Sequence, residues 1–184
     1  HISGAIGWCM FDYNTHKDFG SGDRICYHGV MDMFRNPKYA SYVYTSQSDS
    51  KPLLEIASNL QIGDFEASEI KEVIVLTNAE YIKFYINDDF IGDFYPSDAY
   101  KYLPHPPVII DDFIGNIIHE NESFKTKDAD KIKDILLTIM RKGMKLPLSK
   151  KLSMLYILTK YKMSIDEAAK LYEKYVGKWG LESL

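Results

Sequence analysis

The sequence predicts an α+β protein: an antiparallel β-sandwich with an appended helical subdomain, preceded by one strand–loop–helix unit. Short strand-like runs with tight turns occupy the middle of the chain, and amphipathic helical patterns fill most of its last third. The 184 residues are 46% hydrophobic, which is enough for a packed core in one ordinary domain or two small ones. We therefore expect three segments: residues 1–48, 49–108 and 109–184.

The first segment has the pattern of a single βα unit. Gly4 to Phe11 is a short apolar run, and a polar, glycine-containing stretch follows it from Asp12 to Arg24. This order predicts a buried strand and then a loop of the kind that carries function. Pro37 suits the first position of a helix, so a short helix is expected from Pro37 to about Thr45. One βα unit cannot bury its strand alone.

The second segment follows a polar linker and contains the strand-like runs. These are Leu53–Ser58, Glu72–Thr77, Tyr81–Asn87 and Phe90–Phe94. Within the third run, Ile82, Phe84 and Ile86 alternate with other residues and so lie on one face. Asn87-Asp88-Asp89 is a turn signal before the fourth run. Short strands joined by such turns favour an antiparallel sandwich.

The third segment shows helical periodicity. Apolar residues recur at i, i+3, i+4, i+7 and i+8 in Ile132, Ile135, Leu136, Ile139 and Met140. Gly143 is placed to end that helix, and Ser149 to cap the next one, whose apolar stripe is Leu152, Leu155 and Tyr156.

A capping box, Ser164-Ile-Asp-Glu167, predicts the start of a last helix. Gly177 is expected to stop it. Its apolar stripe is Ile165, Ala168, Ala169, Tyr172, Tyr175 and Val176.

Composition excludes several classes of function. No apolar run approaches the ~20 residues of a membrane helix, and the start of the chain lacks a signal peptide. Cys9 and Cys26 are the only cysteines, too few for a disulfide framework, so a cytoplasmic location is expected. Residues 125–162 hold eleven Lys or Arg and three Asp, which is better explained by a solvated helical face than by phosphate binding. We expect no cofactor and no metal; Lys17 stands where a calcium loop needs glycine.

The most specific sequence motifs lie near the amino terminus. Gly7-Trp-Cys-Met-Phe-Asp-Tyr-Asn-Thr-His16 and Gly22-Asp-Arg-Ile-Cys-Tyr-His-Gly29, followed by Pro37-Lys38, resemble the end of the catalytic barrel in glycoside hydrolase family 2, the β-galactosidase and β-glucuronidase family. Leu76-Thr-Asn-Ala-Glu-Tyr-Ile-Lys-Phe-Tyr-Ile-Asn87 and Phe90-Ile-Gly92 resemble the immunoglobulin-like domains that follow that barrel. The resemblance implies that residues 1–48 are the last strand, loop and helix of a TIM barrel, and that residues 49–108 are an immunoglobulin-like sandwich. The helical segment has no counterpart in it.

The resemblance implies a role for Trp8 as a platform for the sugar. Active-site groups of a βα barrel sit at the carboxyl ends of its strands, and an indole offers a rigid apolar face to a pyranose. Asp12, Asn14, Arg24 and His28 are expected to bind sugar hydroxyls, with His16 and Asp23 as further polar candidates. The alternative for Trp8 is a core position in the strand.

Two departures from the family pattern limit the expected activity. The family's glucuronidases carry a lysine just before the glycine that matches Gly29; His28 stands there instead, which disfavours a uronic acid substrate. Retaining glycosidases need two carboxylic acids, which in this family are glutamates on earlier barrel strands. That segment lies upstream of Trp8, so the chain contains no catalytic residue and is expected to be inactive alone.

A second class of function remains open: a noncatalytic carbohydrate-binding or interaction module. Aromatic residues expected on the sandwich surface would serve it, namely Tyr81, Tyr85, Tyr95, Tyr100 and Tyr102. Leu155 to Tyr175 also has the spacing of a DNA-binding helix–turn–helix. Its second helix begins Ser-Ile-Asp-Glu, which places acids where base-reading groups belong, so no nucleic acid and no membrane partner is expected.

Overall fold

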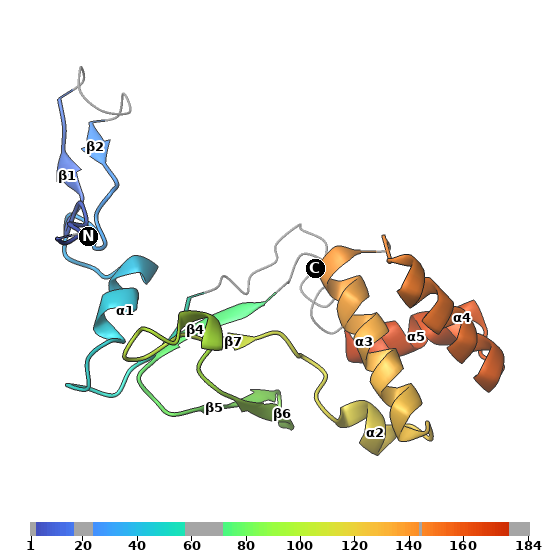
Figure 1. Cartoon of the computed structure of the whole chain (residues 1–184). Coiled ribbons are helices and arrows are strands. Elements are labelled where there is room, and N and C mark those ends of the chain that lie inside the picture. The colour runs from blue at the N-terminus through green and yellow to red at the C-terminus, as the bar shows by residue number, and fades with distance from the viewer. Residues whose placement is uncertain (1–2, 17–23, 58–71, 144, 177–184) are drawn as a thin grey trace.

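A computed structural model describes residues 3–16, 24–57, 72–143 and 145–176. It confirms the α+β class, with small antiparallel sheets and helices α1–α5, and the described residues form no closed barrel. An amino-terminal arm, residues 3–48, extends from one side of the strands, and α2–α5 gather on the other side (Figure 1). Within these described ranges, no helix is long and apolar enough to cross a membrane.

The arm contains a two-stranded hairpin and one helix. β1 (Tyr13–Asn14) pairs antiparallel with β2 (Ile25–Cys26), and α1 spans Tyr39–Thr45. The helix therefore begins two residues after Pro37 and ends where the sequence predicted. Residues 4–11 do not form the expected buried strand, and Ile6 is 95% exposed. A strand inside a parallel sheet needs a hydrogen-bonded neighbour on each side and covered faces, and among the described residues this segment pairs along its backbone with Val30–Met31 on one side.

The central sheet has three antiparallel strands in the order β3–β4–β7. β3 is Leu54–Ile56, β4 is Val73–Thr77 and β7 is Val108–Ile110. β4 lies in the middle and carries three β-branched valines or isoleucines, which suit a buried strand. The sequence analysis found β3 and β4 but missed β7, a three-residue strand after a proline-rich segment.

A second, separate ribbon is the hairpin of β5 (Ile82–Ile86) and β6 (Asp89–Phe94). Ile86 pairs with Asp89, so Asn87 and Asp88 form the turn, and Asn87 has φ +53°. Asparagine tolerates this left-handed conformation better than most residues. The predicted turn is confirmed.

Helices follow the sheets. α2 spans Ile117–Asn121, α3 Thr126–Lys142, α4 Leu148–Tyr161 and α5 Ile165–Tyr175. Gly143 has φ +62° at the end of α3, and the Ser164–Glu167 capping box opens α5, both as predicted. The expected end of α5 at Gly177 lies outside the described residues.

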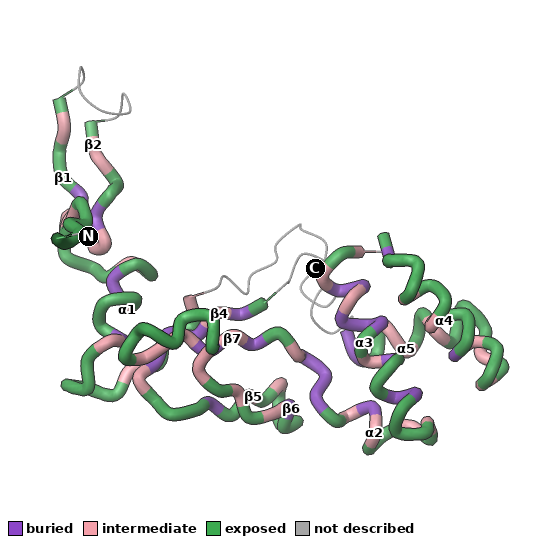
Figure 2. The backbone as a smooth tube through the Cα atoms, viewed as in Figure 1, coloured by how far each residue is buried: buried purple, intermediate pink, exposed green. Residues whose placement is uncertain are grey.

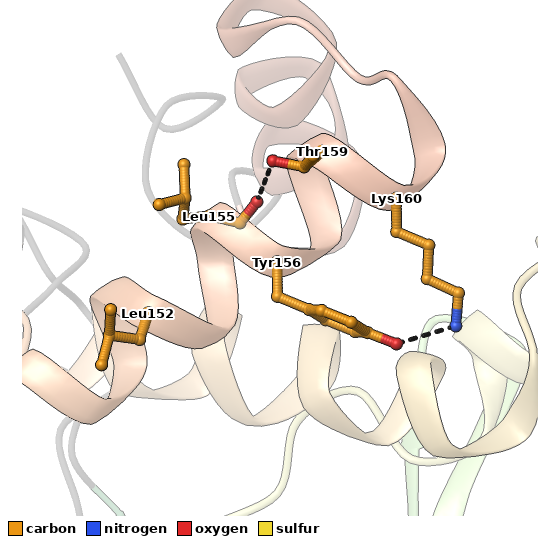
Figure 3. Close-up of a pocket in the computed structure, with 5 residues that line it drawn as sticks. All are labelled: Leu152, Leu155, Tyr156, Thr159 and Lys160. Carbon is orange, nitrogen blue, oxygen red and sulfur yellow. Dashed lines mark hydrogen bonds between the residues drawn. The ribbon is translucent and has the colours of Figure 1, made fainter.

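Two predictions for α4 are wrong. Pro147, not Ser149, precedes the helix, because proline is accepted where the first backbone N–H groups have no helical partner. Leu152, Leu155 and Tyr156 are exposed and, with Thr159 and Lys160, line a shallow hollow (Figure 3). The helix meets the core through Ile157 instead, which is 4% exposed.

One hydrophobic core joins the sheets to the helices. Its centre is formed by Val108, Ile114, Ile118, Met140 and Val176, and Phe84, Ile86 and Phe94 of the hairpin pack against it. Figure 2 shows the buried stretches concentrated in β4, β7 and α3 and in the segment before α2. Asp128 of α3 is buried and accepts hydrogen bonds from Lys160 Nζ (2.5 Å) and Tyr161 Oη (2.8 Å), which fastens α4 to α3.

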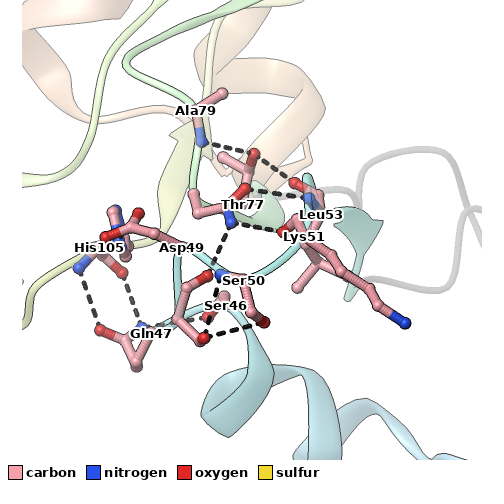
Figure 4. A network of polar contacts seen from close by, with 11 residues as sticks. Ser46, Gln47, Asp49, Ser50, Lys51, Leu53, Thr77, Ala79 and His105 are labelled. Atoms are coloured by element: carbon pink, nitrogen blue, oxygen red, sulfur yellow. Dashed lines mark hydrogen bonds and ion pairs between the residues drawn. The ribbon is translucent and has the colours of Figure 1, made fainter.

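Polar contacts connect the arm to this core (Figure 4). Gln47, just after α1, donates to the carbonyl of His105 (2.8 Å) and accepts from its backbone N–H (3.1 Å). His105 Nε2 lies 2.9 Å from Asp49 Oδ1. Thr77 Oγ1 of β4 donates to the Leu53 carbonyl at 2.6 Å. The end of the arm is therefore attached to the segment before β7 by the two hydrogen bonds between Gln47 and His105.

Candidate functional site

An exposed indole is the main feature of the arm. Trp8 is 73% exposed, and its ring meets Tyr13 edge-on, with centroids 6.4 Å apart and an interplanar angle of 88°. Trp8 Nε1 donates to Tyr13 Oη at 3.2 Å. Trp8 is thus exposed within the described chain, as are its neighbours Ile6 and Met10. The contact fixes the ring edge and leaves apolar surface open.

Asp12 holds the base of the arm together. Its side chain is almost fully buried, and Oδ1 accepts from Lys38 Nζ at 2.6 Å and from the Gly29 backbone N–H at 2.9 Å. Lys38 also donates to the Tyr27 carbonyl at 3.2 Å. A buried carboxylate needs a paired cation and hydrogen bonds, and Asp12 has both. Among the residues predicted to bind sugar, Asp12 is thus buried and held by the protein itself.

The fold of the arm requires a glycine at position 29. The segment Cys9–Asp12 runs beside Val30–Met31, with hydrogen bonds of 3.0 Å from Val30 N to Cys9 O, from Met31 N to Met10 O and from Asp12 N to Met31 O. A Cβ atom on Gly29 would collide with the backbone of Phe11 and Asp12. Only glycine permits this close approach of two backbones.

The side chains of Cys26 and His28 lie next to those of Trp8 and Tyr13 on the same side of the hairpin. Cys26 pairs with Tyr13 across the two strands, and Cys26 Sγ lies 3.2 Å from His28 Nδ1. A side-chain hydrogen bond with Cys26 is the largest influence that raises the pKa of Tyr13 above its ordinary value. Trp8, Tyr13, Cys26 and His28 therefore form a continuous row of contacting side chains, of which the sequence analysis selected the two ends.

The remaining predicted residues lie further along the hairpin. Asn14 is exposed and pairs with Ile25, and Arg24 is exposed while its carbonyl accepts the Thr15 N–H at 2.9 Å. His16 is exposed and Asp23 lies outside the described residues. Their roles as sugar ligands stay predictions.

Two important residues were missed as site residues. Lys38 was noted only for its place in the Pro37-Lys38 pair, because its bond to Asp12 spans 26 positions and leaves no local pattern. Tyr13 was missed because its contact with Trp8 depends on how the hairpin folds and leaves no pattern in the sequence. Within the described parts of the chain, no group of three or more His, Cys, Asp or Glu is arranged to hold a metal ion.

Comparison with known proteins gives one consistent result. A β-galactosidase of Thermoanaerobacterium thermosulfurigenes is 59% identical over 114 residues, which cover 60% of this chain and 16% of that protein. A β-galactosidase of Thermoanaerobacter pseudethanolicus is 48% identical over 111 residues, covering 58% of this chain and 15% of that protein. One of Rhizobium meliloti is 36% identical over 114 residues, covering 60% of this chain and 15% of that protein. No protein-family model matches.

The chain thus spans about a sixth of the length of the curated relatives it matches. It matches part of three proteins named β-galactosidase. What the described residues of the arm offer chemically is an exposed aromatic surface flanked by polar groups.

Proposed function

We propose that this chain is the carboxyl-terminal part of a family 2 glycoside hydrolase of the β-galactosidase type, and that Trp8 contacts the sugar in the complete enzyme. The observation that carries the proposal is the identity to three β-galactosidases. The edge contact of Trp8 with Tyr13, which leaves the face of the indole open, supports the role of Trp8. A large apolar ring that remains on the surface suits the apolar face of a pyranose. Its flank of polar groups suits sugar hydroxyls.

The arm would form the last strand, loop and helix of a TIM barrel, residues 1–48. The poor burial of residues 4–11 supports this assignment, because such a strand obtains its cover from neighbouring barrel strands and helices. Residues 49–108 would be the immunoglobulin-like domain that follows the barrel, and residues 109–184 a helical elaboration of it. Asn14, Arg24 and His28 would face the sugar side of the barrel, and Asp12 would support the site through its bonds to Lys38 and Gly29.

The reaction would proceed by two displacements with net retention at the anomeric carbon. It requires a carboxylic acid to protonate the leaving oxygen and a carboxylate to attack, about 5–5.5 Å apart. Both would come from glutamates upstream of residue 1. The contribution of this chain would be binding: the aromatic surface orients the sugar so that those acids meet the glycosidic bond.

The test uses the complete gene product. We expect the enzyme to hydrolyse a chromogenic β-galactoside and to release β-galactose first, seen in the anomeric protons by NMR before mutarotation. The chain of 184 residues is expected to show no turnover in the same assay. Release of α-galactose first, or no hydrolysis by the complete enzyme, would contradict the proposal. Turnover by the chain alone would reveal a catalytic pair within it.

A further inference from the structure

The outer side of the β5–β6 hairpin carries two exposed aromatic pairs. Tyr81 and Tyr95 stack at the open end of the hairpin, with centroids 5.7 Å apart and an interplanar angle of 26°. Tyr85 and Phe90 lie near the turn, with centroids 5.3 Å apart. Each of these four rings is between 41% and 65% exposed. They belong neither to the core nor to the arm.

A β-bulge builds this surface. Strand alternation would place Phe90 on the same side as Gly92 and Phe94, toward the core. The register shifts between Phe84 and Tyr85, so that Phe90 pairs with Tyr85 while Ile91 becomes the extra, buried residue. A bulge re-aims side chains in this way. Phe90 is thereby exposed next to Tyr85 instead of being buried.

A polar pair separates the two aromatic pairs. Lys83 and Asp93 face each other across the strands, both exposed, and Lys83 Nζ lies 5.9 Å from the Phe90 ring centroid. Their charges cancel, so the surface has no net attraction for an anion or a cation. It does offer a hydrogen-bond donor and an acceptor between apolar rings. We call the six residues Tyr81, Lys83, Tyr85, Phe90, Asp93 and Tyr95 the aromatic face.

We propose that the aromatic face binds a neutral oligosaccharide, at a site separate from Trp8. Rings stack on the C–H faces of sugar units, while Lys83 and Asp93 bond to hydroxyls between them. Tyr81 and Tyr85 are four residues apart on an extended strand, about 13 Å, which suits a ligand of several sugar units rather than a monosaccharide. The neutral polar pair between two apolar surfaces matches the alternation of hydroxyls and C–H faces in such a ligand.

The test measures binding of the full 184-residue chain to soluble β-1,4-galactan by affinity electrophoresis, and to galactotetraose by calorimetry. The double variants Tyr81→Ala/Tyr95→Ala and Tyr85→Ala/Phe90→Ala should each weaken binding at least tenfold. Tyr102→Ala is the matched control, because Tyr102 is 91% exposed and lies outside the face. Lys83→Ala/Asp93→Ala removes only exposed polar groups and should also weaken binding while the melting temperature stays unchanged.

The two double variants should weaken binding by the same factor in a Trp8→Ala background, which separates the aromatic face from the proposed active-site role. Loss of binding with Trp8→Ala alone would assign the sugar to the arm and overturn the inference. No binding by the wild-type chain, or equal binding by the double variants and Tyr102→Ala, would also overturn it. A concentration-dependent dimer in sedimentation that the double variants abolish would show the face to be a contact between copies.

Discussion

The arm and the core of this protein are stabilised by different interactions. Every buried hydrophobic residue of the described chain lies between Val73 and Val176, whereas the buried side chains of the arm are polar: Asp12, Ser41 and Ser46. The core excludes water with apolar packing. The arm is held together by backbone hydrogen bonds, by the close approach of Gly29 to the backbone of Phe11 and Asp12, and by the bond of Lys38 to Asp12. The arm residues that we propose to contact sugar thus lie where the described chain has no buried apolar side chain.

This difference indicates how the two regions depend on their surroundings. A region with its own apolar core keeps its structure alone, while a region without one needs cover from elsewhere. The exposed run at residues 4–11 is the part that a neighbouring domain would bury. The following substitutions and conditions test this difference between the arm and the core.

The largest effect is expected from Ile118→Ala. Ile118 is completely buried at the junction of sheet and helices, so truncation leaves a cavity and costs about 2–5 kcal/mol of unfolding free energy. Ile6→Ala removes the same atoms from a residue that is 95% exposed and should cost less than about 0.5 kcal/mol. Denaturant unfolding by circular dichroism measures both. Equal costs would refute the location of the core.

Lys38→Met should disorganise the arm while the core remains folded. It leaves the Asp12 carboxylate buried without its cation, which costs about 1–3 kcal/mol locally because Lys38 is itself partly exposed. Hydrogen exchange should accelerate at the Asp12 and Met31 amides and stay slow in α3. Lys51→Met, at an exposed position, is the control. A cooperative loss of protection in both regions would show that they unfold as one unit.

Acid should weaken the contact between α3 and α4. The hydrogen bond from Lys160 is the largest influence that holds the pKa of Asp128 below its ordinary 3.8. A lowered folded-state pKa stabilises the protein above the unfolded-state value, and this contribution is lost as pH falls below about 4 through the folded-state pKa. The melting temperature should therefore drop in that range, and Asp128→Asn should flatten the dependence. An unchanged slope in the variant would exclude Asp128 as its source.

The smallest effect is expected on the exposed face of α4. Leu155→Ser replaces a side chain that is 61% exposed at the hollow of Figure 3, so the unfolding free energy should change by less than about 0.5 kcal/mol. Ile157→Ser, two residues along and buried, should be strongly destabilising. Thermal melts of the two variants, run side by side, compare the two faces of the helix. Similar losses would place Leu155 in the core.

The sequence predicted the structural features that depend on only a few adjacent residues. The capping box at Ser164, the end of α3 at Gly143 and the turn at Asn87 each need only a few adjacent residues, and each is confirmed. The exposed Leu152–Leu155–Tyr156 stripe was not predictable, because periodicity identifies an apolar face but does not show whether anything covers it. The Asp12–Lys38 pair was missed because its two residues are far apart in the sequence, and a contact between distant residues leaves no local pattern. Within the candidate site, the sequence identified Trp8 and His28 as candidate residues. The contacts that connect these two residues through Tyr13 and Cys26 could not be predicted from the sequence.

Kinetics of Trp8 variants in the complete enzyme test the central claim most directly. If Trp8 supports the sugar, Trp8→Ala should lower kcat/KM on a β-galactoside about tenfold or more, equivalent to about 1.4 kcal/mol of lost transition-state binding. Trp8→Phe, which keeps an aromatic surface, should retain most of the activity, and the melting temperature of both variants should match the wild type. Unchanged kcat/KM in Trp8→Ala, with the fold intact, would contradict the account.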